Sequence, residues 1–182
     1  NDLTAVAQTG YYLSRANQTI IAAGASYLPL LFSSEVNFFK LPSEQKTKIL
    51  ADLSTSGEPL NQASYDLSIA LSSVQQIKDQ QLLVDFGVNL AELTELIASH
   101  KTLIDKVIPL SKVIPALAGY PERATYLLVL QNRDELRPTG GFIGTIGQAE
   151  VLNGDIMRLT TEDVYHLDMP AQGQFKIKPP AI

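Results

Sequence analysis

Apolar side chains recur every three, four or seven residues through the first 119 residues of the chain, a spacing that places them on one face of an α-helix. The pattern covers residues 3–24, 44–53, 59–81 and 89–107. It predicts an α-helical hairpin or bundle, in which two long helices are joined by residues 82–88.

Several residues mark the expected ends of these helices. Ser43 and Asn89 are predicted N-caps, because their side-chain oxygens can accept from free backbone N–H groups. Pro59 suits the first turn of a helix, where its missing N–H costs nothing. Pro109 and Pro115 are expected to kink or stop the last helix, since proline removes a helical hydrogen bond.

One apolar and aromatic segment, Tyr27–Phe39, stands between the first two predicted helices and is interrupted by Pro29. It is too short to span a bilayer, which takes about 20 residues. We interpret it as part of the core, with a surface that faces a partner as the alternative.

The period changes after Gly119-Tyr120-Pro121, which is the clearest boundary signal in the chain. Residues 126–130 are apolar on both faces and predict a buried strand in a sheet covered by helices. Residues 142–151 and 156–160 predict two further strands joined by an Asn153-Gly154 hairpin turn. A short strand-like piece follows at residues 174–177.

These patterns define a mixed α+β or α/β fold class. The α-helical hairpin or bundle is expected over residues 1–119, as a stalk or bundle. Residues 120–182 are expected to form the start of an α/β sheet domain with a β-hairpin, which continues beyond this sequence.

The composition of the chain argues against several classes of function. The net charge of −5 argues against nucleic-acid binding, because neutralising phosphates takes surplus Lys and Arg. It also disfavours docking on anionic lipid. The chain has no cysteine, which excludes disulfides, thiolate nucleophiles and cysteine-based zinc sites.

The turn after the first predicted strand is the main candidate site, since ligands of open α/β sheets bind at the carboxyl ends of strands. Arg137 offers a fork for a carboxylate or phosphate, and paired glycines allow close backbone approach. The predicted ligand-binding residues are Asn132, Arg133, Arg137, Thr139, Gly140 and Gly141. The alternative is a tight structural turn in which Arg137 only pairs with Asp134, Glu135 or Glu150.

A second, acidic group lies further along, where Glu162, Asp163 and Asp168 surround His166. Carboxylate oxygens suit Mg²⁺ or Ca²⁺, so Asp163 and Asp168 are secondary metal candidates. An acid-rich helix start is the favoured alternative, since acids stabilise the positive end of the helix dipole. The other histidine, His100, is interpreted as a solvated residue, and a hydrolase triad has little support.

The strand and turn YLLVLQNRDELRPTGGFIGTIG, followed by an Asn-Gly hairpin, resemble domain-of-unknown-function family 4012. The resemblance implies a bacterial cell-surface protein in which an N-terminal membrane anchor and a helical region precede an α/β domain. The anchor and the later part of the domain are then expected outside this sequence.

That family is similar in outline to LytR-CpsA-Psr proteins, which attach glycopolymers to bacterial cell walls. In those proteins an Arg and a following Asp hold a polyprenyl pyrophosphate and magnesium. Here Arg137 stands in the place of that Arg, but Pro138, Thr139 and the two glycines follow it without an Asp. The missing carboxylate argues against phosphotransfer, which relies on a cation over the phosphates.

The leading hypothesis is therefore a non-catalytic, extracytoplasmic module without a cofactor, which binds a cell-wall polymer, a lipid-linked ligand or another surface protein. The second is a LytR-CpsA-Psr-like phosphotransferase that uses magnesium, with Arg133 and Arg137 on the pyrophosphate and Asp134 or Asp163 assisting the metal. The third is a structural subunit that forms a homo-oligomer in a surface assembly.

Overall fold

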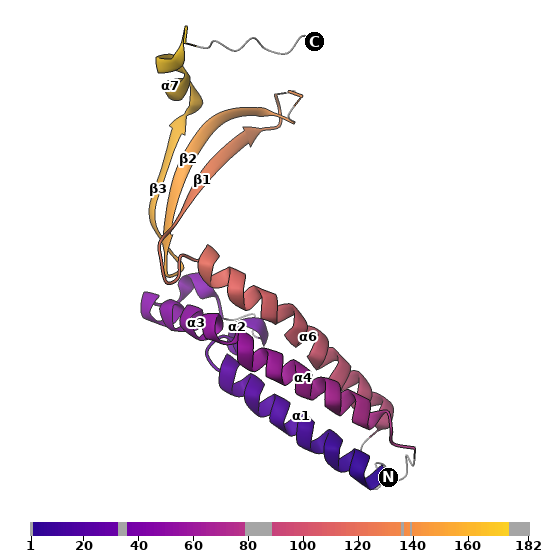
Figure 1. The fold of residues 1–182 in the computed structure, drawn as a ribbon. Helices are drawn as coiled ribbons and strands as arrows, with labels where there is room; N and C mark the ends of the chain where they lie inside the picture. Colours follow the sequence, from indigo (N-terminus) through magenta and orange to yellow (C-terminus); the bar gives the residue numbers. More distant parts are fainter. Residues whose placement is uncertain (1, 33–35, 79–88, 136, 139, 175–182) are drawn as a thin grey trace.

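The computed structural model describes residues 2–32, 36–78, 89–135, 137–138 and 140–174. The helical part contains α1 (Asp2–Gly24), α2 (Leu28–Phe32), the 3-10 helix η1 (Phe38–Lys40), α3 (Ser43–Thr55), α4 (Gly57–Val74) and α6 (Leu90–Leu117). It is followed by β1 (Ala124–Asn132), β2 (Phe142–Leu152), β3 (Asp155–Asp163), α7 (Val164–Asp168) and η2 (Met169–Ala171). The helices form an elongated bundle, and the sheet projects from one end of it (Figure 1). The predicted fold class, a helical region followed by a sheet with a hairpin, is confirmed.

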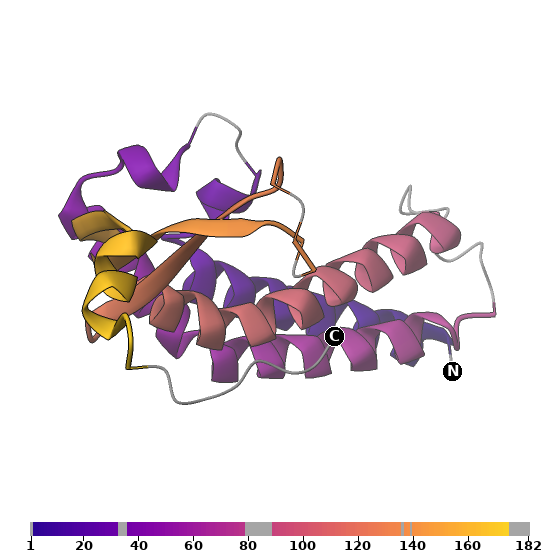
Figure 2. The ribbon, with the colours of Figure 1, turned by 90° about the horizontal axis from the view of Figure 1, so that it is seen from above.

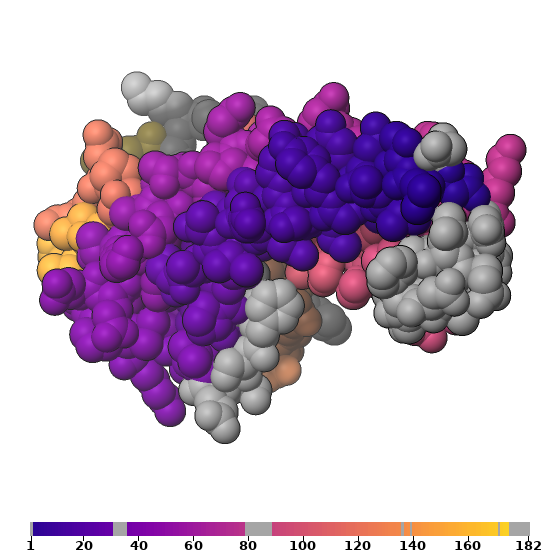
Figure 3. Space-filling view, turned by 90° about the horizontal axis from the view of Figure 1, so that it is seen from below, coloured from indigo at the N-terminus to yellow at the C-terminus, as the bar shows by residue number. Residues whose placement is uncertain are grey.

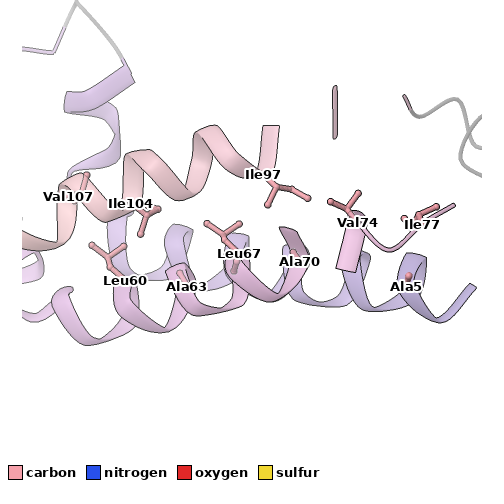
Figure 4. Close-up of a cluster of buried hydrophobic side chains, with 11 residues drawn as sticks. Ala5, Leu60, Ala63, Leu67, Ala70, Val74, Ile77, Ile97, Ile104 and Val107 are labelled. Atoms are coloured by element: carbon pink, nitrogen blue, oxygen red, sulfur yellow. The ribbon is translucent and has the colours of Figure 1, made fainter. Parts of the chain in front are cut away.

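The bundle core lies where α1 and α6 pack against α4, and the three helices run side by side (Figure 2). On α4, residues three and four apart are at most 1% exposed: Leu60, Ala63, Leu67 and Ala70. Figure 4 shows these side chains facing Ile97, Ile104 and Val107 of α6. Seen from below, α1 and the segment from α2 to α4 make up most of the visible face (Figure 3). Burial of each large aliphatic side chain contributes about 1.5–3 kcal/mol, so this seam holds the bundle together.

A buried carboxylate, Asp66, joins α4 to α1. Arg15 Nε donates to Asp66 Oδ2 at 2.7 Å, Arg15 Nη2 donates to Oδ1, and Gln62 Nε2 donates to Oδ1 at 3.0 Å. The Arg15 guanidinium also lies 5.5 Å and 5.0 Å from the ring centroids of Tyr11 and Tyr12. The hydrogen bond from Arg15 is the main cause that lowers the pKa of Asp66 below its usual value, because it favours the ionised form.

Of the two predicted N-caps, Asn89 is confirmed and Ser43 is wrong. Asn89 is an N-cap, since its Oδ1 accepts from the backbone N of Ala91 at 2.8 Å and of Glu92 at 3.3 Å. Ser43 is not, because α3 begins at Ser43 itself and the Ser43 hydroxyl donates to Asp155 at 2.6 Å. The Ser43 hydroxyl therefore bonds to a residue far away in the sequence, and not to the free backbone N–H groups at the start of its own helix.

Two further helix predictions need correction. The helix expected over residues 59–81 ends at Val74, and residues 79–88, with the expected linker at 82–88, lie outside the described residues. Pro109 and Pro115 lie inside α6, so the prediction that they stop it is wrong. A proline inside a helix costs about 3 kcal/mol. The buried face of α6 nevertheless continues past the exposed Pro109 to Ser111 and Pro115, and packing of that face outweighs the cost.

The apolar segment Tyr27–Phe39 divides between core and surface in its described part. Tyr27 is 5% exposed and packs with Ile49 and Leu53 of α3, whereas Phe39 is 81% exposed. The interpretation as core holds for Tyr27 but not for Phe39, and the alternative of a surface that faces a partner stays a prediction.

The sheet is antiparallel with the order β1-β2-β3. The expected hairpin turn joins β2 to β3: Asn153 has φ of 51° and Gly154 has φ of 81°, as the central residues of a type I′ turn require. The short strand expected over residues 174–177 falls almost wholly outside the described residues.

The prediction that β1 is a buried strand is wrong for the described chain. Leu127 is 73% exposed, and Val129 and Leu130 are each 50% exposed. The reason is that the described long helices pack on one another in the bundle, so no helical layer covers the sheet within the described residues. β1 is instead an edge strand with an apolar sequence.

The β2–β3 turn fastens the sheet to the bundle. The backbone N of Asn153 donates to Gly119 O at 3.1 Å, and that of Gly154 donates to Ala118 O at 2.7 Å, just after α6. Lys46 of α3 is 6% exposed, and its Nζ lies 2.6 Å from Asp155 Oδ1. The hairpin turn is thus the main joint between the two parts, while their division into separate domains at residue 119 stays a prediction.

Candidate functional site

The predicted ligand turn begins where β1 ends and is held by hydrogen bonds between side chains and backbone. Asn132 Oδ1 accepts from the backbone N of Asp134 at 3.0 Å, as in an Asx turn. Gln131 Nε2 donates to Gly141 O at 3.1 Å across the strand ends. A Cβ added to Gly141 would lie 2.3 Å from Asn132 O, so glycine is required there for strand pairing.

Arg137 forms a salt bridge with a neighbouring acid. Its Nη2 lies 2.6 Å from Glu135 Oε1, and its guanidinium carbon lies 5.2 Å from the ring centroid of Phe142. About half of each charged side chain is exposed, so the pair contributes at most about 1 kcal/mol. Glu135 is one of the three acids that the structural alternative named for Arg137.

The other predicted ligand residues that the structure describes lie at the end of β1 and in the turn that follows it. Arg133 is exposed and makes no ion pair within the described part of the chain. Gly140 lies in the turn, where its backbone N donates to Arg137 O at 2.9 Å. Thr139 lies outside the described residues. The described residues of the turn are thus joined by hydrogen bonds within it, and the prediction that it binds a ligand stays a prediction.

The acidic group near His166 forms a helix start. Asp163 is the N-cap of α7, and its Oδ1 accepts from the backbone N of Tyr165 at 2.9 Å. His166 Nδ1 lies 3.6 Å from Glu162 Oε1. Among the residues that the structure describes, no group of three or more His, Asp or Glu side chains is arranged to hold a metal ion, and this applies to Asp163 and Asp168.

The sheet and the two short helices that follow it expose many large apolar side chains. Within residues 124–169 they are Leu127, Val129, Leu130, Ile143, Ile156, Met157, Leu159, Tyr165, Leu167 and Met169. Leu127, Gln148 and Thr160 face one another across the three strands and line a shallow hollow of about 490 Å³. Among them Leu127 and Val129 lie on the same face of β1, and exposed apolar patches mark interaction sites.

A second hollow lies inside the bundle, and the sequence pattern did not predict it. It measures about 210 Å³ and includes His100, whose Nδ1 is buried. His100 is partly exposed, so the interpretation as a solvated residue holds for part of the side chain and fails for Nδ1. A signal existed: His100 follows Ile97 by three residues and precedes Ile104 by four, which places it on the buried face of α6.

The fold and its surfaces define a mixed α+β protein in which a helical bundle carries an open antiparallel sheet. Residues 122–179 match the family model described as "Protein of unknown function (DUF4012)", and this match supports the assignment of that segment to the family. It includes the strand and glycine turn on which the resemblance was based. No curated protein and no solved structure matches the chain. In the described residues, no helix combines the length and apolar character that a membrane span requires.

Proposed function

We propose that this chain is a non-catalytic binding module of the bacterial cell envelope, in which the helical bundle carries a sheet that docks a polypeptide strand along β1. The observation that carries the proposal is the exposure of β1. Its sequence is typical of an inner strand, yet it lies at the edge of the described sheet with Leu127 73% exposed.

The two edge strands differ in how they are protected. β3 carries charged residues at Asp155, Arg158, Glu162 and Asp163, and such charges discourage further strand pairing. β1 has nine residues with no charge and no proline. It therefore lacks the charges and the proline that often keep an edge from pairing, and the backbone groups on its outer side before the register shift at Leu130/Gln131 suit an added strand.

The apolar side chains of β1 add to the attraction for a polypeptide. Covering Leu127, Val129 and Leu130, which are 50–73% exposed, would contribute about 3–5 kcal/mol at the usual value for buried aliphatic side chains. A polysaccharide offers neither a matching backbone ladder nor such apolar groups. This favours a surface protein, or a later part of the same polypeptide, over a cell-wall polymer or a lipid-linked ligand.

The extracytoplasmic location and the membrane anchor in this proposal rest on the family resemblance. The non-catalytic character is supported by the turn at Arg137, where the guanidinium is engaged by Glu135 and Phe142. A LytR-CpsA-Psr-like phosphotransferase needs that guanidinium for a pyrophosphate and a carboxylate for magnesium, and no described contact favours it.

Photo-crosslinking tests the docked strand. Benzoyl-phenylalanine is placed at Leu127 or Val129 in the full protein in its native bacterium, and at Ile156 of β3, which is 67% exposed, as the matched control. We expect positions 127 and 129 to crosslink to residues two apart in one polypeptide segment, because alternate residues of a strand share a face. Crosslinks to glycan only, or equal yields from position 156, would refute the proposal.

A further inference from the structure

The outer side of β1 is open in the described part of the chain. Among the described elements, β2 is the only one in extensive contact with β1, and β1 forms the right-hand edge of the sheet in Figure 1. Its pairing with β2 is regular from Ala124 to Leu130, and the register shifts only after Leu130. A regular, uncharged stretch of backbone is therefore available to a further strand.

This stretch is complementary to itself. Its middle residue is Leu127, which at 73% exposed is the most exposed apolar residue of β1. The same stretch of a second copy can pair with it in the antiparallel direction, with the two Leu127 side chains opposite each other. The remaining pairs then also join uncharged residues: Thr125 with Val129, Tyr126 with Leu128, and Ala124 with Leu130. Such cross-strand pairs of apolar side chains are the contacts that stabilise a sheet.

Arg123, which precedes β1, distinguishes this register from its neighbours. In this register Arg123 lies opposite the uncharged Gln131 of the other copy. Moving the centre one residue toward the C-terminus would place Arg123 opposite Arg133, and like charges directly opposite destabilise a sheet. Moving it one residue the other way would place the guanidinium opposite an apolar side chain. Glu150 offsets only part of this charge, because Arg123 and Arg158 share it.

We propose that the strand docked on β1 is β1 of a second copy of this chain, paired antiparallel about a twofold axis at Leu127. The inference rests on the proposed function, which assigns a polypeptide strand to this edge, and it names that strand. The two three-stranded sheets would join into one sheet of six strands. Leu127 and Val129 of both copies would lie on one face of it, since alternate residues share a face. Each copy offers the same surface, as a twofold interface requires.

Disulfide crosslinking tests the register, because the chain has no cysteine of its own. Residues directly opposite each other in antiparallel strands have Cα atoms about 4.5–5.5 Å apart, which a disulfide spans. In a glutathione redox buffer, the full chain with Leu127→Cys should form a covalent dimer. Thr125→Cys and Val129→Cys should each stay monomeric alone, because the two copies of either residue lie about 13 Å apart along the strands, and should link to each other when mixed. Ile156→Cys, at a position of β3 that is 67% exposed, is the control and should not crosslink.

Sedimentation equilibrium tests the pairing without a crosslink. One strand pair is a small interface, so we expect a reversible dimer whose population rises with protein concentration. Leu127→Lys should weaken this dimer by at least about tenfold, because it places two ammonium groups opposite each other and removes the central apolar pair. Ile156→Lys is the matched control and should leave the dimer unchanged. Both side chains are exposed, so both variants should keep the circular dichroism spectrum of the wild type.

Three results would each overturn the inference. They are a wild type that stays monomeric up to about 1 mM, a dimer that Leu127→Lys does not weaken, and a disulfide that forms with Thr125→Cys alone as readily as with Leu127→Cys. The proposed function would survive any of them if position 127 crosslinked to a different polypeptide in the bacterium. It would fail separately if that position crosslinked to no polypeptide at all.

Discussion

Replacing Gly154 with alanine tests the joint between the bundle and the sheet. Gly154 has φ of +81°, and a Cβ added there would lie 2.8 Å from two ring atoms of Phe38. An L-residue in the left-handed region costs about 1–2 kcal/mol. Displacing the ring from Ile49 and Leu53, against which Phe38 packs, adds about 1–2 kcal/mol.

We therefore expect Gly154→Ala to lower the free energy of unfolding by about 2–4 kcal/mol, which corresponds to a fall of about 5–15 °C in melting temperature for a chain of this size. Urea unfolding followed by circular dichroism, together with calorimetry, measures the change. The loss should appear in the sheet and in α3 together, because the turn contacts both.

Substitutions at two other glycines separate the cost of the backbone conformation from the cost of the steric clash. Gly140 has φ of +94° with only the end of the Gln131 side chain within 4 Å of its added Cβ, so Gly140→Ala should show the backbone cost without the clash. Gly10 lies in α1 with nothing within 4 Å, so Gly10→Ala should stabilise the protein by about 0.5–1 kcal/mol. In a Phe38→Ala background, the cost of Gly154→Ala should fall by about 1–2 kcal/mol. The account would be refuted if Gly154→Ala lowered the free energy of unfolding no more than Gly140→Ala does. It would also be refuted if the loss were the same in the Phe38→Ala background, because the clash with the Phe38 ring would then contribute nothing.

Three further predictions concern single residues. The pKa of Asp66 is lowered by Arg15 in the folded state, so the stability that the ionised carboxylate contributes is present above the ordinary aspartate pKa of about 3.9 and is lost as pH falls through the lowered value; the difference in urea midpoint between wild type and Asp66→Asn should shrink below pH 4, and a constant difference would contradict this account. Asn89→Ala should cost about 1 kcal/mol through loss of the α6 cap, with Asn89→Ser restoring most of it, as urea unfolding would show. Arg137→Ala should change stability by less than about 1 kcal/mol and leave the crosslinks from position 127 intact; a thermal shift caused by Mg²⁺ and a polyprenyl pyrophosphate analogue in the wild type, and abolished in this variant, would instead favour the phosphotransferase.

The elements that the sequence predicts well are those whose cause is local. The spacing of Leu60, Ala63, Leu67 and Ala70 defines a buried face without knowledge of the partner helix. The Asn153-Gly154 pair specifies its own turn, because both residues tolerate positive φ. The Asn89 cap likewise depends only on the next three residues.

The features that escaped prediction depend on residues far apart in the chain. Ser43 bonds to Asp155 and not to its own helix end, and nothing near Ser43 indicates this partner. The bundle hollow combines side chains of α1, α4 and α6, so only the packed structure brings Tyr27 and His100 to the same hollow. The exposure of β1 was not predicted for another reason. An apolar strand sequence shows that burial of the strand against another segment is favourable, but it does not show which segment would bury it.

The length of α6 determines how far the sheet stands from the opposite end of the bundle. Its 28 residues form one rod of about 42 Å that ends directly beneath the hairpin joint. If the opposite end is held near a membrane, the rod acts as a spacer, and its length decides which layer of the envelope the open strand can reach. Deleting two turns from matched positions of α4 and α6 would shorten this reach by about 10 Å and nearly preserve the direction in which β1 faces.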